Sequence, residues 1–406
     1  DAINRLGVTL QDIGLNSSAI DMFNKALTVC PQHPGLLANL AVSLRSHGDL
    51  ESAITTFKKA LDADPNRLDV YKALLFAYAC ASEDYALESL DLARTYWQLV
   101  RHQELDAVQL RDTIRNEHNR SPQDPSRIRI GILCADLGQH VVSTFLLPFL
   151  REYDRNLFHV ELISVHRRYE EHASKLVHYA DEAYSLQGLS VNESRSRMRT
   201  RHYDIIVETN GFTRNTGIEL LAERCALVQC HYIGYHASTG LDTMDYIIGD
   251  EEIMPKEFEW QYSEQLWRLP RAWLACCPYH DFPVAKDVVS KDIPVLGSFN
   301  QLTKISNETM FFWAAALTRL PSSVLIVKDK QCSDDKACER ISTFMSDQGV
   351  APDRLFFMPI THDWNDHLQH YNLIDVALDA TPWSSATTAF DALGMGVPLV
   401  AIRGRC

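Results

Sequence analysis

The sequence predicts an α-helical repeat segment followed by two α/β domains, each built on a doubly wound parallel sheet. Three observations predict this order. A 34-residue repeat occupies the start of the chain, one series of strands and helices begins near residue 127, and a second begins near residue 293. Strand and helix patterns that alternate in this way are typical of parallel sheets. A chain of 406 residues is long enough for two or three such domains.

The repeat is defined by small, aromatic and proline residues that recur at one offset. Among the residues whose type recurs 34 positions later are Leu6, Leu10, Gly14, Ala19, Phe23, Ala26 and Pro31. This period, with small residues where paired helices touch and proline after the second helix, is the tetratricopeptide signature. A third copy begins at Leu74 and Tyr78 but loses its aromatic residue, because Asp91 stands in that position. We therefore expect repeats over residues 1–68, and a degenerate repeat, capping helices and a linker over residues 69–125.

The first α/β domain is expected over residues 126–291, after a linker rich in proline and serine. Five apolar runs, mostly separated by helical patterns, are predicted to be its strands: 127–134, 158–165, 203–208, 228–233 and 244–249.

The second α/β domain is expected over residues 292–406. Its predicted strands are 293–299, 323–327, 354–358, 374–379 and 397–402. Two such sheets facing each other across a cleft would form a GT-B architecture, although other proteins with two Rossmann-like domains share the same pattern. Since the chain lacks an initiator methionine and stops just after an expected strand, we interpret it as a fragment whose second lobe is incomplete.

Composition limits the classes of partner and compartment. A net charge of −14 and a pI near 5.6 argue against a general nucleic-acid surface. The sequence contains no apolar run long enough to span a bilayer and no signal-like start. Ten cysteines without a repeating framework indicate reduced thiols, hence a cytoplasmic location, or a nucleocytoplasmic one in a eukaryote.

Asp62-Ala63-Asp64 matches a metal-binding pattern of sugar transferases, but it lies at a helix end before Pro65 and is interpreted as a chance match.

Phosphate binding is the chemistry indicated by the stretch after the predicted strand 374–379. Thr387 and Thr388 fall at the expected start of the next helix, where unpaired N–H groups and a partial positive charge favour an anion. Asp391 lies about one turn later and could accept hydrogen bonds from ribose hydroxyls. The alternative is that Thr387 only caps the helix and Asp391 only favours its first turn.

Three more candidates follow predicted strands. Gln301 and Lys304 come after strand 293–299, where Lys304 could bind a diphosphate and Gln301 a base or a phosphate. His367 follows strand 354–358 and could donate to phosphate. In the first domain, His140 follows strand 127–134 and is a candidate acid, base or sugar-binding group. Each has an ordinary surface or loop role as its alternative, but strand ends of one sheet share an edge, so the second-domain residues are expected to converge.

Besides the repeats, the chain contains a series of motifs at residues 136–140, 210–213, 244–248, 262–264, 299–304 and 387–391. In the order and spacing of these motifs, the chain resembles the protein O-GlcNAc transferase and SPINDLY-like family, glycosyltransferase family 41. The resemblance implies a metal-independent, inverting GT-B enzyme without a cofactor, which transfers a sugar from a nucleotide diphosphate to serine or threonine hydroxyls of proteins that the repeats select.

The resemblance also implies roles for individual residues. The nucleotide sugar would be bound by Gln301, Lys304, His367, Thr387, Thr388 and Asp391. His140 would lie near the sugar and the acceptor and is the candidate base, with a donor phosphate oxygen or a water chain as alternatives. Lys304 and the helix start at Thr387 would stabilise the departing diphosphate, which makes both His140 and Lys304 catalytic candidates.

Departures from the family pattern leave the sugar open. The animal enzymes have histidine where this chain has Ala386, their glycine-rich loop appears here as residues 234–240 with bulkier side chains, and their insertion between the lobes is absent. We expect transfer of GlcNAc from UDP-GlcNAc, with fucose from GDP-fucose as the alternative. A non-catalytic scaffold with a degenerate nucleotide lobe and a sugar-nucleotide epimerase are the hypotheses from other classes.

Overall fold

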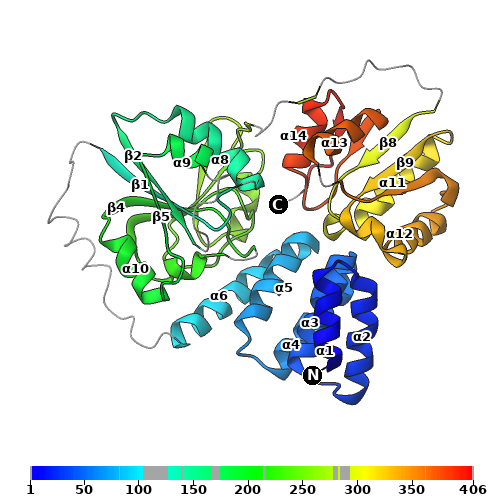
Figure 1. Cartoon of the computed structure of the whole chain (residues 1–406), viewed down its shortest axis with the longest axis horizontal. Coiled ribbons are helices and arrows are strands. Elements are labelled where there is room, and N and C mark those ends of the chain that lie inside the picture. The colour runs from blue at the N-terminus through cyan, green and yellow to red at the C-terminus, as the bar shows by residue number, and fades with distance from the viewer. Residues whose placement is uncertain are drawn as a thin grey trace. The chain divides into compact units, whose positions relative to one another are not determined.

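The computed structural model describes residues 2–81, 83–103, 127–138, 140–165, 174–213, 216–277, 282–283, 293–361 and 363–404. The chain divides into two compact units (Figure 1). The first unit combines residues 1–85 with residues 280–405, and the second contains residues 86–279. Three segments are named by their residues: the repeat segment is 2–81, the first α/β domain is 127–277, and the second α/β domain is 293–404.

The repeat segment consists of helices joined by tight turns. They are α1 (Ala2–Asp12), α2 (Asn16–Val29), α3 (Pro34–His47), α4 (Leu50–Ala63) and α5 (Leu68–Ala81). The recurring Ala19 and Phe23, with their counterparts Ala53 and Phe57, are completely buried, as expected for residues where paired helices touch. Gly48 ends α3 in the left-handed region at φ 91°, and Asp49 then caps α4 by accepting from the Ser52 amide at 3.1 Å.

Helix α6 (Ala86–Gln103) belongs to the second unit. Its Tyr96 hydroxyl donates to Glu219 at 2.7 Å, and the Trp97 indole N–H donates to the Thr239 carbonyl at 2.7 Å. Both aromatic side chains are buried, so α6 is packed as part of the first α/β domain.

The first α/β domain contains a seven-stranded sheet in the order β3-β2-β1-β4-β5-β6-β7, with all neighbours parallel. Its strands are β1 (Ile128–Cys134), β2 (Phe158–Ser164), β3 (Glu182–Ser185), β4 (Tyr203–Glu208), β5 (Ala226–His231), β6 (Tyr246–Asp250) and β7 (Gln265–Leu269). Its helices are α8 (Val141–Glu152), α9 (Ser174–Tyr179) and α10 (Val191–Arg199), with 3-10 turns Ile218–Ala222 and Lys256–Gln261. The sequence did not predict β3 and β7. β3 is short and polar, and β7 lies at the sheet edge, where Trp267 is half exposed.

The second α/β domain contains a five-stranded parallel sheet in the order β10-β9-β8-β11-β12. Its strands are β8 (Val295–Ser298), β9 (Val324–Lys328), β10 (Leu355–Met358), β11 (Val376–Leu378) and β12 (Leu399–Val400). Its helices are α11 (Asn307–Arg319), α12 (Asp335–Asp347), α13 (Trp364–Gln369) and α14 (Thr387–Gly394), with 3-10 turns η5 (Leu302–Lys304), η6 (Lys330–Ser333), η7 (Pro352–Arg354) and η8 (His370–Leu373).

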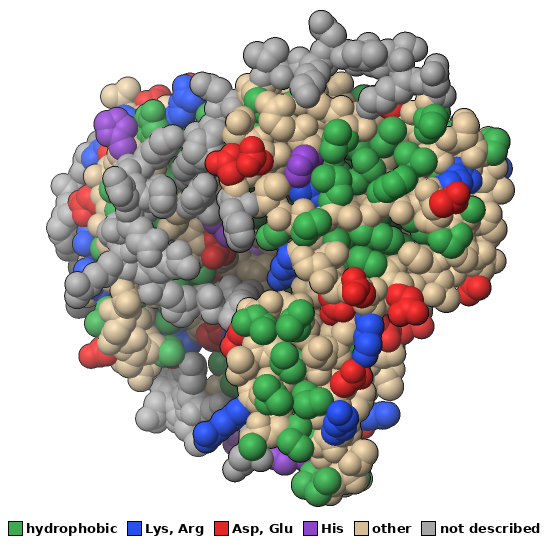
Figure 2. Space-filling view, turned by 45° about the vertical axis from the view of Figure 1, so that its right-hand side comes forward, with side chains coloured by type: hydrophobic (Ala, Val, Ile, Leu, Met, Phe, Trp, Pro, Cys, Tyr) green, Lys and Arg blue, Asp and Glu red, His purple; other side chains and the backbone are tan. Residues whose placement is uncertain are grey.

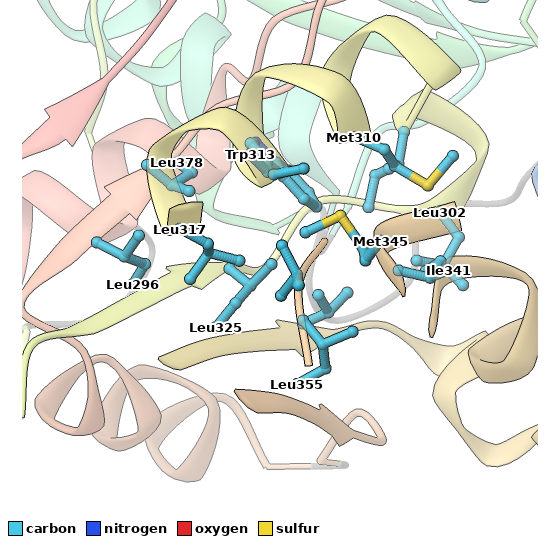
Figure 3. Close-up of a cluster of buried hydrophobic side chains, with 14 of the residues drawn as sticks. Leu296, Leu302, Met310, Trp313, Leu317, Leu325, Ile341, Met345, Leu355 and Leu378 are labelled. Atoms are coloured by element: carbon cyan, nitrogen blue, oxygen red, sulfur yellow. The ribbon is translucent and has the colours of Figure 1, made fainter. Parts of the chain in front are cut away.

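The core of this domain lies between the sheet and helices α11 and α12, where aliphatic and sulfur side chains surround Trp313 (Figure 3). The Trp313 indole N–H donates to the carbonyl of Asp379 at 3.1 Å. This bond ties the core to the loop that follows β11, which is one of the loops that build the candidate site.

Candidate functional site

The chain order of the second sheet places a topological switch point between β8 and β11. From β8 the chain moves outward to β9 and β10, and it then returns to the other side of β8 with β11 and β12. Ligands of doubly wound sheets bind at the carboxyl ends of the strands where this reversal occurs. Here those ends lead into η5 and into the loop 379–386, so the predicted residues of both segments lie at this position.

Lys304 ends η5 and reaches across to the loop after β11. Its Nζ donates to the Ser384 carbonyl at 3.4 Å and lies 5.3 Å from the centre of the Trp383 ring. Burial lowers the pKa of Lys304, while the charges of Cys80 and Asp379 oppose that effect. Among the described residues no carboxylate oxygen lies within 4 Å of this ammonium, so it can accept an anion as a ligand. Gln301, at the start of η5, is exposed.

Helix α14 begins at Thr387, as the sequence predicts, and its N-cap is Ala386, which provides no side-chain hydrogen bond. Thr387 is therefore the first helical residue and not the cap, so the alternative interpretation of Thr387 as a capping residue is wrong. The loop before it is held by Asp379, whose Oδ1 accepts from the amides of Ala380 and Ser385, both at 2.8 Å. The N-terminus of α14 thus keeps N–H groups for a ligand without a competing side chain.

His367 and Asp391 lie together, and the structure adds a lysine that the sequence analysis missed. Lys328, at the end of β9, places its Nζ 2.9 Å from His367 Nδ1. His367 Nε2 lies 3.8 Å from Asp391 Oδ2. Because the Lys328 ammonium can only donate, His367 accepts through Nδ1 and carries its proton on Nε2, toward Asp391. The contact with Lys328 thus favours one tautomer of the His367 ring.

Burial shapes this cluster. Lys328 is 2% exposed and Asp391 is 7% exposed. Burial lowers the pKa of Lys328 from 10.5 to about 8, against the charge of Asp366. Tyr371, stacked edge-on against the His367 ring at 5.7 Å, donates its hydroxyl to the Thr388 carbonyl at 3.2 Å and has a raised pKa because it is buried. A lysine that ends an otherwise apolar strand was the signal in the sequence that could have revealed Lys328.

The candidate in the first α/β domain, His140, lies at the corresponding switch point of its own sheet, between β1 and β4. It is the N-cap of α8, where Nδ1 accepts from the Val142 amide at 3.3 Å, and it is largely exposed. Its Nδ1 lies 3.8 Å from Asp136 Oδ2. Asn210, in the loop after β4, donates to the same Asp136 oxygen at 2.6 Å and accepts from the Ala135 amide at 2.9 Å. Asp136 lies near His140 and Asn210 holds Asp136; both occur in the motifs 136–140 and 210–213, but the sequence analysis did not name them as site residues.

A buried ion pair holds the loop that follows β4. Glu208 and His231 are each 1% exposed or less, with His231 Nδ1 2.7 Å from Glu208 Oε2. Burial acts to lower the pKa of His231, but the hydrogen bond and charge of Glu208 outweigh it, so the pKa is raised. Glu208 also accepts from the amides of Asn210 and Gly211, at 2.8 and 2.9 Å. The pair therefore determines the path of the backbone that carries Asn210.

One cluster among the described residues has the composition of a metal site: His159, Glu161 and Glu182. Arg129 and Arg201 both form ion pairs with Glu161. Because these guanidinium groups already compensate the carboxylate, the cluster is an ion-pair network of the first sheet.

No described helix combines the length and apolar composition that crossing a membrane requires.

Comparisons with known proteins agree with this fold. The family model of glycosyl transferase family 41 matches residues 100–290 and 285–406, and a tetratricopeptide repeat model matches residues 34–67. The chain is 31% identical over 294 residues to a probable UDP-N-acetylglucosamine--peptide N-acetylglucosaminyltransferase SPINDLY of Solanum lycopersicum, covering 71% of this chain and 31% of the relative. The Arabidopsis thaliana protein of the same name is 32% identical over 292 residues, covering 70% of this chain and 32% of the relative.

A solved structure of a mutant of the Thermobaculum terrenum O-GlcNAc transferase superimposes with a TM-score of 0.87 at 28% identity, covering all of this chain and 76% of that one. This match confirms the predicted fold class of helical repeats followed by two Rossmann-like domains. The chain spans about a third of the length of the curated relatives. On the extent of the family match, the chain belongs to glycosyl transferase family 41.

Proposed function

We propose that this chain contains the catalytic region of a protein O-glycosyltransferase that transfers GlcNAc from UDP-GlcNAc to serine or threonine hydroxyls, with inversion at the anomeric carbon. One observation carries the proposal. At the switch point of the second sheet, Lys304 contacts the loop that leads into the N-terminus of α14, and that N-terminus has no side-chain cap. The chain that contains this arrangement belongs to family 41. The names of the relatives support the donor and the acceptor class.

The chemistry follows from where charge develops. The acceptor oxygen attacks the anomeric carbon, the bond to the diphosphate breaks, and the leaving diphosphate gains negative charge. Burial lowers the pKa of Lys304 and removes part of the water around its side chain, so in the ammonium form its attraction to that charge would be stronger than in water. The α14 amides add hydrogen bonds along the helix dipole. With these groups in the role of a divalent cation, we propose that the reaction needs neither metal nor cofactor.

The remaining second-domain residues are assigned to the nucleotide. Asp391 accepts from ribose hydroxyls, and His367, held by Lys328, presents its Nε2–H toward Asp391 and the ligand. Gln301 offers a donor and an acceptor from the exposed start of η5, and the Thr387 and Thr388 hydroxyls contact phosphate at the start of α14.

We assign the general base to His140. Its Nδ1 accepts from the Val142 amide, so Nδ1 is the basic nitrogen, and a proton taken there from the acceptor hydroxyl replaces that hydrogen bond. The resulting imidazolium lies beside the Asp136 carboxylate, which Asn210 holds in place. The repeats are proposed to bind the acceptor protein, as solenoids of this type do. Ten cysteines without a repeating framework support a cytoplasmic or nucleocytoplasmic location.

Calorimetric titration with UDP and with GDP in EDTA tests the proposal. UDP should bind without metal, and Lys304→Met should weaken it by roughly 10- to 150-fold, the value of a hydrogen bond to a charged group. Lys59→Met, an exposed lysine of α4, is the matched control and should leave the affinity unchanged. Preference for GDP would transfer the assignment to a fucosyl donor, and a strict requirement for a divalent metal would overturn the mechanism.

A further inference from the structure

Side chains of the repeat segment take part in the surroundings of Lys304. Phe76, on α5, packs against Trp383 of the loop after β11, with 5.0 Å between ring centroids and 54° between ring planes. The Lys304 ammonium lies over the Trp383 ring at 5.3 Å. Arg45, on α3, lies over the Phe76 ring at 5.0 Å, and its Nη1 donates to the Ala73 carbonyl of α5 at 3.2 Å. Two cations and two rings therefore form one contact series from α3 to Lys304.

The backbone supports this series at a second point. Gly48, at the end of α3, approaches η5, the turn that carries Lys304. A Cβ at Gly48 would lie 3.1 Å from the Leu302 carbonyl, which is a tight contact, and 2.5 Å from the end of the flexible Arg340 side chain. Together with φ 91°, this explains why glycine stands there.

Polar contacts hold the repeat segment to the second α/β domain beyond this point. Ser17 donates its hydroxyl to Asp334 Oδ1 at 2.9 Å and its amide to Oδ2 at 3.0 Å. Asn16 donates to Gln331 Oε1 at 2.8 Å, and all four residues are buried. Acidic and basic side chains lie side by side on this face of the molecule (Figure 2). Lys336 of the second α/β domain and Asp21 of the repeat segment form an ion pair at 2.8 Å. The repeats are thus packed onto the domain that carries Lys304, and these contacts hold Phe76 and Trp383 in neighbouring segments.

The contact series has a direct effect on the lysine. An ammonium is attracted to the face of an indole ring, so the plane of Trp383 determines where the Lys304 side chain rests. That plane is set in part by the tilted contact with Phe76, since aromatic pairs favour particular relative orientations. Removing the Phe76 ring releases Trp383 to other orientations, and Lys304 then loses its preferred position.

We propose that Phe76 of the repeat segment is a positioning residue for Lys304, acting through Trp383, so that the repeats help to set the affinity of the diphosphate site. This inference rests on the proposed function, in which Lys304 binds the donor diphosphate. Because binding free energies are reciprocal, an acceptor protein that shifts α5 would alter donor affinity, and the donor would alter acceptor affinity by the same factor.

A pair of substitutions in the 406-residue chain separates the ring from its volume. Phe76→Leu removes the ring and keeps apolar bulk, whereas Phe76→Tyr keeps the ring. Phe76→Leu should weaken UDP binding by roughly 3- to 10-fold, the value of one aromatic contact, and Phe76→Tyr should restore it. Phe311→Leu, a half-exposed phenylalanine on α11, is the matched control and should change nothing.

A double-mutant cycle tells positioning from general damage. In a Lys304→Met background, Phe76→Leu should cause no further loss of UDP affinity, because the group that it positions is already gone. Additive losses in the double variant would overturn the inference, and so would unchanged UDP affinity in Phe76→Leu.

A measurement without nucleotide keeps the two proposals distinguishable. With lysines ¹³C-dimethylated, the Lys304 N-methyl resonance, assigned by its loss in Lys304→Met, should be shifted by the Trp383 ring. It should return toward the position of an exposed lysine in Phe76→Leu but not in Phe76→Tyr. If the wild-type chain binds no UDP but its Lys304 resonance moves in Phe76→Leu, the proposed function is refuted and the coupling of Phe76 to Lys304 is retained. A resonance that does not move in Phe76→Leu would refute the coupling.

Discussion

Lys328→Met is expected to stabilise the first unit while weakening nucleotide binding. Lys328 is 2% exposed, and its one hydrogen-bond partner among the described residues is His367, which carries no negative charge to compensate it. The fall of its pKa from 10.5 to about 8 corresponds to about 3 kcal/mol, of which the lost charge-assisted bond to His367 offsets about 2. We therefore expect the free energy of unfolding to rise by about 1 kcal/mol at pH 7.

The pH dependence has a definite sign. The pKa of Lys328 is lower in the folded chain than in the unfolded chain, so folding disfavours the charged form. Below about pH 8 both states are protonated and the folded state carries the full cost; between about 8 and 10.5 the cost disappears as the folded lysine loses its proton. The advantage of the methionine variant should be complete at pH 7 and smaller at pH 9.

Urea unfolding followed by circular dichroism, at pH 7 and pH 9, measures this difference, and calorimetry with UDP measures the affinity. Lys330→Met, an exposed lysine two residues later, should leave both quantities unchanged. Lys328→Met removes the charge-assisted hydrogen bond that holds His367, which is assigned to the nucleotide, so UDP affinity should fall roughly tenfold. A methionine variant less stable than the wild type at pH 7 would refute the reasoning, because it would mean that the buried ammonium is well compensated.

Two further predictions concern buried partners. His231→Ala leaves the Glu208 carboxylate buried without its cation and should lower the free energy of unfolding by about 3–5 kcal/mol, measured by urea unfolding. Because the pKa of His231 is raised, the contribution of the pair is complete below 6.5 and is lost as pH rises through the folded-state value; a wild-type stability equally high on both sides of that value would contradict this. Asp334→Ala removes the acceptor of both Ser17 donors and should cost about 1–3 kcal/mol, with faster hydrogen exchange of the Ser17 amide as the specific sign; unchanged exchange would show that the contact does not hold the repeats.

Local patterns in the sequence predicted the elements whose physics is local. The period that buries Phe23 and Phe57 and the apolar runs that became β1 and β9 are visible without any tertiary contact. The start of α14 at Thr387 was also predictable, because a strand, a polar turn and a small-residue helix follow one another there.

The contacts that complete the candidate site could not be predicted, because they join distant segments. Nothing in the sequence near Lys304 indicates that Phe76 approaches it through Trp383, and nothing near His367 indicates that Lys328 fixes its tautomer. β7 was missed for a related reason: an edge strand has only one neighbour to impose a pattern, and its side chains are half exposed. The proposed roles of the site residues remain predictions for the titrations described above.

The bonds from Ser17 to Asp334 span 317 residues, and this separation governs the order in which the chain can fold. At synthesis rates of about 5–20 residues per second, the repeats wait roughly 15–60 s on the ribosome before their partner surface has been made. The second unit, residues 86–279, is contiguous and can fold within that interval. Until Asp334 has been synthesised, the Ser17 hydroxyl and the Asn16 amide of the repeats can form hydrogen bonds with water instead. A polar contact at this point thus lets the nascent repeats remain unassociated until the last part of the chain arrives.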